Sequence, residues 1–197
     1  MMRYYRKGDT LIEVMLAFSL FTMVAIGGLA LMNSGVSKTQ ATLQLTMARN
    51  AIDSQAEALR YINSLAVAGS GSNDAGLWNA VTSSTVGSAS DLSLCPSNRS
   101  QFPSSAFILG YDNGSRISRI DTTRLNPATT FPRLIWRSED DTNNLAEKAN
   151  FVGAEGLWIE AVKGSGYYDF HIRACWTAPG ESSPTTLGTI VRLYDPR

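Results

Sequence analysis

A run of nineteen apolar or small uncharged residues, 14–32, constrains the fold of this chain more than any other feature. No charge follows it until Lys38. As a helix rising about 1.5 Å per residue, the run would extend roughly 28 Å, close to the hydrocarbon thickness of a bilayer. We therefore expect residues 9–35 to form a helix that can cross a membrane.

A carboxylate and a basic leader stand in front of this run. Glu13 enters it directly, and a carboxylate at the bilayer centre costs roughly 2.5–3.5 kcal/mol unless it reaches the interface or finds a cation. Residues 1–8 contain three basic side chains and end in glycine, namely Arg3, Arg6, Lys7 and Gly8. Basic residues beside a membrane helix stay on the cytoplasmic side. Residues 36–197 are then expected to form one extracytoplasmic globular domain.

In this order, the basic leader, Gly8, the residues Thr-Leu-Ile-Glu at 10–13 and the apolar run resemble the amino-terminal signal of the type IV pilin family. The family includes major pilins, minor pilins and pseudopilins, and the resemblance covers about the first thirty residues. It implies that a prepilin peptidase removes leader 1–8 by cutting between Gly8 and Asp9, and methylates the new amino terminus. It also implies that Glu13, the fifth mature residue, pairs with the amino terminus of a neighbouring subunit during filament assembly.

Asp9 departs from the family pattern, in which the mature chain usually begins with phenylalanine. Its carboxylate could compete with an incoming Glu13 for the positive amino terminus. An acid at the start of a helix is also favourable to the helix macrodipole. Both interpretations of Asp9, a competitor and a simple helix cap, stay open.

Other signals fit the segment less well. A secretory signal needs a small-residue cleavage site after the apolar run, where residues 25–27 offer only Ala-Ile-Gly. A lipoprotein signal needs a cysteine there, and the first cysteine is Cys95. An uncut signal anchor remains the alternative to a pilin leader.

The charge balance of the mature chain excludes one class of function. Removal of the leader with its three basic residues leaves fourteen basic against seventeen acidic side chains. A net charge of −3 argues against a general nucleic-acid binder, which carries a basic surface. The 197 residues suffice for one domain and an anchor.

The two cysteines, Cys95 and Cys175, predict a long-range disulfide. Outside the cytoplasm, thiols meet an oxidising environment. Closing so long a loop contributes on the order of 4 kcal/mol in the chain-entropy account. A pair of free buried thiols is the alternative.

An amphipathic helix is predicted to continue from the membrane run, because residues 36–67 contain neither Pro nor Gly. Its apolar positions are Val36, Leu43, Met47, Ile52, Leu59, Ile62 and Leu65. One helix from Asp9 to Val67 would extend roughly 88 Å. Its weak point is Gly27 with Gly28, which either lets the helix unravel on assembly or allows close helix packing in lipid.

The rest of the chain changes from loop to strand character. Residues 68–105 are rich in Gly, Ser and Thr, which predicts a long loop with at most a short helix or strand. Strands are predicted at 106–111, 133–137, 157–163, 167–177 and 187–194, and the turn at 164–166 marks a hairpin. A long helix against one face of an antiparallel sheet is an α+β fold, similar to that of the type IV pilins.

Alternation along 167–177 predicts the two faces of that strand. Five residues are expected to face the helix: Tyr168, Phe170, Ile172, Ala174 and Trp176. The opposite face carries Asp169, His171, Arg173 and Cys175. The segment around Cys95 should therefore cross the outer face or the edge of the sheet.

Catalytic and metal sites have little support in this sequence. His171, the one histidine, shares a strand face with Asp169, so a Ser-His-Asp site would need a serine from elsewhere. One histidine and two distant cysteines do not make a zinc site. The oxygen-rich residues 139–144 lack the spacing of a calcium-binding EF-hand loop, and a solvated acidic loop is the preferred interpretation. We expect neither an enzyme nor a cofactor.

The expected function is that of a structural subunit, a minor pilin, in a type IV pilus-like filament. Its partners would be other pilin subunits, the prepilin peptidase, the pilus assembly machinery and the membrane, with no nucleic acid. It would lie in the cytoplasmic membrane before assembly and in a cell-surface filament afterwards. A pseudopilin of a secretion or DNA-uptake system, or a monomeric signal-anchored binding domain, is the alternative.

Overall fold

The computed structural model describes residues 9–69, 71–91, 93–112, 116–136 and 151–196. The chain divides into two compact units, Met1–Thr42 and Leu43–Arg197, which are treated separately below. The first unit consists, where described, of helix only. The second contains the end of that helix, a second helix and two sheets.

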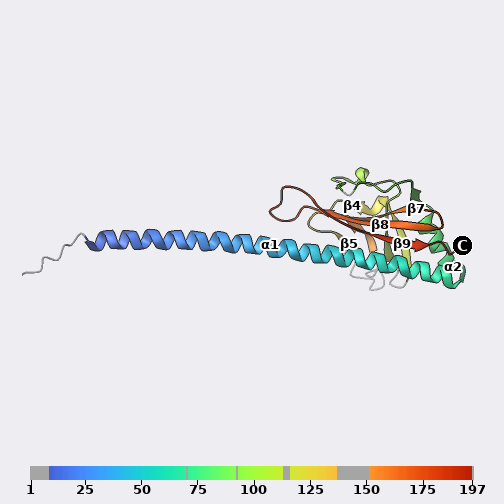
Figure 1. Cartoon of the computed structure of the whole chain (residues 1–197), viewed down its shortest axis with the longest axis horizontal. Coiled ribbons are helices and arrows are strands. Elements are labelled where there is room, and N and C mark those ends of the chain that lie inside the picture. Colours follow the sequence, from blue (N-terminus) through green and yellow to red (C-terminus); the bar gives the residue numbers. More distant parts are fainter. Residues whose placement is uncertain (1–8, 70, 92, 113–115, 137–150, 197) are drawn as a thin grey trace, which may run out of the picture. The chain divides into compact units, whose positions relative to one another are not determined.

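Helix α1 (Asp9–Ala68) contains sixty residues without a break (Figure 1). The predicted helix is confirmed, one residue longer than expected. Gly27 and Gly28 do not interrupt it, and a Cβ at either would meet nothing within 4 Å. The helix ends at Gly69, whose φ of 65° is the left-handed conformation that glycine adopts beyond a helix carboxyl terminus.

The part of α1 in the second unit buries one face. Its buried apolar residues follow helical spacing: Ala48, Ile52, Ala56, Leu59 and Ile62. The predicted positions Ile52, Leu59 and Ile62 are confirmed, whereas Leu43 and Met47 are 55% and 39% exposed and Leu65 is half-buried. In the first unit Val36 is also exposed. Small alanines, which a search for large apolar residues passes over, complete the buried face instead.

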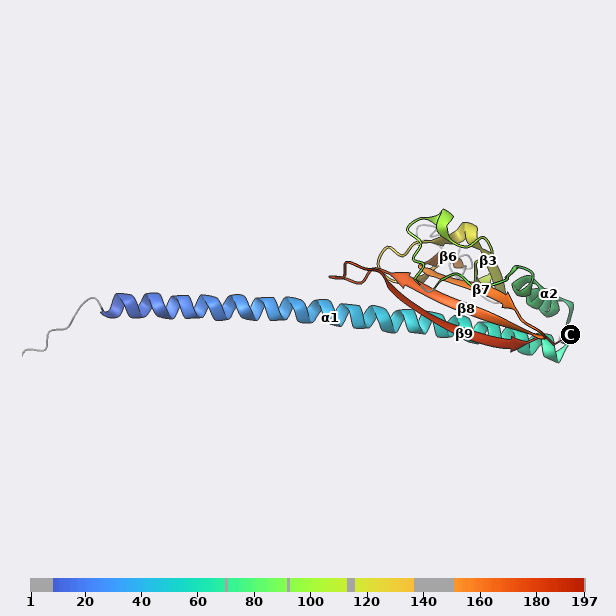
Figure 2. The ribbon, with the colours of Figure 1, turned by 45° about the horizontal axis from the view of Figure 1, so that its top comes forward.

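The main sheet has the strand order β3-β2-β7-β8-β9, and β1 pairs in parallel with β7. The bounds are β1 Thr85–Val86, β2 Phe107–Asp112, β3 Arg116–Asp121, β7 Leu157–Lys163, β8 Tyr167–Trp176 and β9 Thr185–Tyr194. Strands β7, β8 and β9 run side by side (Figure 2). The predicted hairpin is confirmed, with Leu157 opposite Ala174 and Gly166 at a φ of 78° in its turn.

A second sheet has the order β4-β6-β5, formed by Leu125–Asn126, Phe151–Glu155 and Arg133–Trp136. Two short 3-10 helices, Arg99–Gln101 and Thr122–Arg124, complete the regular structure. Gly153 lies where a Cβ would meet the carbonyl oxygen of Arg124 at 2.2 Å. The close approach of these two backbones therefore requires glycine at this position.

The alternation predicted for β8 is confirmed on its inner face, where all five residues are buried. Trp176 Nε1 donates to Oε1 of Gln44 in α1 at 3.2 Å. At the other end of the strand, Tyr168 and Phe170 contact the ring of Trp78, which belongs to helix α2 (Gly71–Thr82). Thus Trp78 of α2 also covers part of this face, for which the sequence predicted only the long helix.

Several elements differ from the sequence-based expectation. Helix α2 is a short helix of the kind allowed within residues 68–105, but its position was not predicted, and neither were strands β3, β4 and β6. Strand β9 begins two residues earlier than expected, at Thr185. The acidic residues 139–144 lie outside the described part of the chain. The α+β class itself is confirmed, with the long helix packed on an antiparallel sheet.

Candidate assembly segment and disulfide-closed face

The amino-terminal part of α1 exposes large apolar side chains on every side. Between residues 11 and 32 their exposed fractions run from 56% at Leu20 to 77% at Leu31. The helix is long and apolar enough to cross a membrane. Its hydroxyls suit that environment, because Ser19 Oγ donates to the Leu16 carbonyl at 2.8 Å and Thr22 Oγ1 to the Ser19 carbonyl at 2.9 Å. An apolar surface of this extent indicates membrane anchoring or coverage by other helices.

Of the two predicted processing residues, Gly8 falls outside the described part of the chain, and Asp9 is the first residue described, within α1. Glu13 is exposed in the first turns. Positions 9 and 13 are four residues apart, so the helix places them one turn apart on the same side. This spacing is compatible with both interpretations of Asp9.

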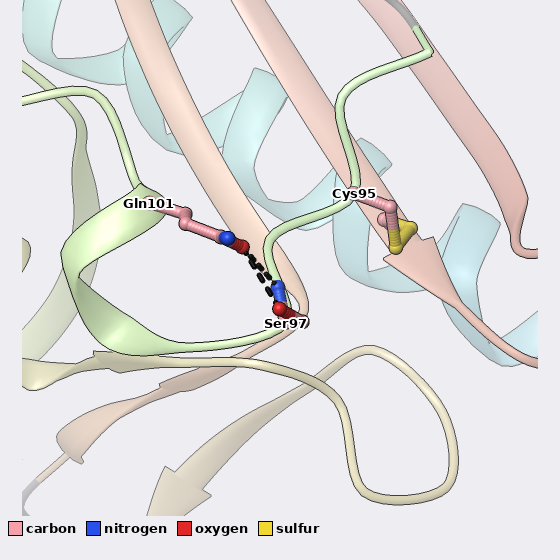
Figure 3. The surroundings of a disulfide bond; sticks show 4 residues. Cys95, Ser97 and Gln101 are labelled. Carbon is pink, nitrogen blue, oxygen red and sulfur yellow. Dashed lines mark hydrogen bonds between the residues drawn. A yellow bond between two sulfur atoms is a disulfide. The ribbon is translucent and has the colours of Figure 1, made fainter.

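Cys95 and Cys175 form the predicted disulfide, with Cα atoms 5.5 Å apart and a sequence separation of 80 (Figure 3). The alternative of two free thiols is therefore wrong. Cys175 belongs to the outer face of β8, opposite the buried Trp176 and Ala174. A disulfide of this kind points to an oxidising, extracytoplasmic environment for the second unit.

Residues 87–102, of which residue 92 is not described, form a strap across this outer face, as the position of Cys175 predicted. Ser90 contacts β7, Asp91 contacts β8 and Phe102 packs edge-on against Trp158 with ring centroids 5.4 Å apart. Beyond Cys95, Gln101 Oε1 accepts hydrogen bonds from Ser97 N at 2.7 Å and from Ser97 Oγ at 3.0 Å (Figure 3). The strap is thus held at several points besides the disulfide.

A buried ion pair lies under the strap. Glu160 Oε2 is 3.6 Å from Nε of Arg173, and their side chains are 1% and 7% exposed. Sequence reasoning placed Arg173 on this face but missed Glu160. The missed signal was a single carboxylate within the apolar run of β7, which a strand keeps buried only when the carboxylate has partners.

The uncovered part of the outer face carries a second ion pair. Arg192 Nε and Nη2 each donate to a different oxygen of Asp169 at 2.7 Å, and the guanidinium lies 4.1 Å from the centre of the Tyr167 ring. Hydrogen bonds from Arg192 hold the pKa of Asp169 below its usual range. Burial, and then the Arg173 cation, lower the pKa of His171. Asp169 is therefore engaged with Arg192 of the neighbouring strand.

Within the described ranges, no group of three or more His, Cys, Asp or Glu side chains could hold a metal ion. Comparisons of the chain with protein-family models, with curated proteins and with solved structures find no match.

Proposed function

We propose that this protein is a structural, non-catalytic subunit, a minor pilin, of a type IV pilus-like filament. Leader 1–8 is removed by a prepilin peptidase between Gly8 and Asp9. The mature chain is held in the cytoplasmic membrane by the first part of α1, and it leaves the membrane when that helix joins the filament. Other pilin subunits and the assembly machinery are its partners.

One observation carries the proposal: α1 is a single sixty-residue helix in which an apolar segment of membrane-spanning length continues without a break into a segment that buries one face. The exposed apolar surface of residues 11–32 supports the proposal, because it requires either lipid or neighbouring helices as cover. The disulfide supports an extracytoplasmic domain.

Glu13 has a defined role in this proposal. In an apolar environment its carboxylate needs a cation, and the amino terminus of a neighbouring subunit is one. Coulomb attraction between the two is several times stronger there than in water. The pairing would favour one register of the incoming helix, since a shift of one turn separates the charges by about 5.4 Å.

Processing tests the proposal directly. Co-expression with a prepilin peptidase should yield a mature chain that begins at Asp9, measured by intact mass and terminal sequencing. Gly8→Val should block the cut, because the cleaved position requires a small residue in the resembling family. Gly35→Val is the matched control, since a Cβ at position 35 would meet nothing within 4 Å and the position lies far along the chain from the cut, so its processing should be normal. An uncut parent chain beside an active peptidase would favour the monomeric signal-anchored alternative.

A further inference from the structure

The strap covers two buried charges whose hydrogen bonds are not all supplied by the sheet. Glu160 in β7 and Arg173 in β8 lie on the same face of the sheet and are 1% and 5% exposed. From the sheet, Glu160 receives one long hydrogen bond, 3.4 Å from Trp158 Nε1 to Oε2. Removing an ion pair from water is unfavourable unless further hydrogen bonds satisfy both groups.

The strap supplies three hydrogen bonds to this pair. Ser90 donates twice to Oε1 of Glu160, from its backbone N at 3.2 Å and from Oγ at 2.7 Å. The carbonyl of Asp91 accepts a hydrogen bond from Nη1 of Arg173. If the strap lifted, three hydrogen bonds would be lost and water would reach both charges.

The disulfide joins the same two parts. Cys95 lies four residues beyond Asp91 in the strap, and Cys175 lies two residues beyond Arg173 on the same face of β8. We propose that the strap is an oxidation-dependent latch, in which formation of the Cys95–Cys175 disulfide and closure of residues 90–91 over the Glu160–Arg173 pair stabilise each other. This device is independent of the filament proposal.

Closure needs an external disulfide as the oxidant, of the protein or small-molecule kind present in oxidising compartments. The thiolate of one cysteine attacks that disulfide and forms a mixed disulfide. The thiolate of the second cysteine then displaces the external sulfur. The two cysteines together lose two protons and two electrons, and the external disulfide is reduced to two thiols.

Thermodynamic coupling is reciprocal, so weakening the contact between strap and ion pair must make the disulfide easier to reduce. The full chain in detergent would be equilibrated in glutathione buffers of graded potential, and its oxidised fraction measured by thiol alkylation and mass spectrometry. For Glu160→Gln we expect the equilibrium constant for reduction to rise roughly tenfold, equivalent to about 30 mV for this two-electron couple.

Two further variants make the result decisive. Ser90→Ala removes one hydroxyl and keeps both charges. It should raise the equilibrium constant for reduction as well, but by less than Glu160→Gln. If Glu160→Gln does not fold, Ser90→Ala still tests the proposal. Asp169→Asn breaks the other ion pair of β8, away from the strap, and should leave the equilibrium unchanged. The latch proposal would be wrong if the parent, Ser90→Ala and Asp169→Asn had the same equilibrium constant for reduction.

Hydrogen exchange gives a second, local measurement. Reduction of the parent chain should accelerate amide exchange in peptides from residues 87–102 and leave those from β9 unchanged. No change in the strap would show that the disulfide only links two segments that are already closed. An equal rise throughout β9 would show general unfolding, and it would contradict a local latch as well.

Discussion

Gln55 of α1 makes with Leu109 of β2 the two hydrogen bonds that a neighbouring strand would make. Its Nε2 donates to the Leu109 carbonyl at 3.0 Å, and the Leu109 N–H donates to Oε1 at 2.9 Å. Strand β2 pairs with β7 only at Phe107, opposite Ile159. The helix side chain thus takes over where the two strands separate, and it ties the long helix to the sheet.

Gln55→Leu tests this contact, because it keeps the side-chain volume and removes both hydrogen bonds. Gln55 and Leu109 are each 2% exposed, so the backbone groups of Leu109 would be left buried without partners. Each such group costs roughly 1–3 kcal/mol, and we expect a loss on the order of 3 kcal/mol in the free energy of unfolding. The measurement is denaturant unfolding in detergent.

Gln40→Ala is its control, at an exposed position of the same helix. Its free energy of unfolding should stay within about 0.5 kcal/mol of the parent. A Gln55→Leu variant as stable as Gln40→Ala would show that water replaces the amide at no cost.

Trp78 is predicted to hold α2 on the sheet. It is 1% exposed, and its ring meets those of Tyr168 and Phe170 edge-on, with centroids 5.8 Å and 6.1 Å away. Trp78→Ala should lower the free energy of unfolding by about 3–5 kcal/mol. Gly76→Ala, an exposed position of the same helix with open space for a Cβ, should instead raise it by up to about 1 kcal/mol. Equal stability of the two variants would contradict this role of Trp78.

His171 makes stability depend on pH in a defined window. Its pKa lies below the ordinary 6.5 because of burial and then the Arg173 cation, so the unfolded chain binds this proton more readily than the folded chain. As far as His171 is concerned, the full stability of the folded chain is present above about pH 6.5, and part of it is lost as the pH falls through the lowered pKa of His171. The free energy of unfolding should therefore decrease between pH 7 and pH 5.

His171→Gln should flatten that part of the profile, as measured by denaturant unfolding at each pH. Loss of the Asp169–Arg192 contribution is separate, because the pKa of Asp169 lies below 3.8 and its proton binds only in stronger acid. An unchanged slope between pH 7 and pH 5 in His171→Gln would exclude the histidine as its cause.

The elements predicted correctly are those whose pattern is local and long. Helix α1 follows from its uninterrupted helix-forming sequence, and β8 from five alternating residues between Tyr168 and Trp176. The sequence also predicted the disulfide and the face that it closes. These features depend on the periodicity of neighbouring residues or on the pairing of the two cysteines, and both can be read directly from the sequence.

The missed elements depend on tertiary contacts. The short helix allowed within residues 68–105 could not be placed from the sequence, because α2 begins in a Gly/Ser-rich stretch and is fixed by the burial of Trp78. Strand β4 has two residues, and β6 contains Gly153, which reads as a strand breaker until the close approach to Arg124 is known. Glu160 was missed because its partners Ser90 and Arg173 come from distant segments.

The amount of Glu13→Gln in sheared filaments, relative to the membrane fraction, tests the filament proposal most directly. The variant should insert and be cut after Gly8 as the parent is, since the leader and the apolar run are unchanged. Its incorporation should fall by more than roughly tenfold, because removing one partner of a buried ion pair costs about 3–5 kcal/mol. Glu57→Gln, an exposed carboxylate of the same helix, should assemble normally. Incorporation of Glu13→Gln equal to that of the parent and of Glu57→Gln would contradict assembly through Glu13.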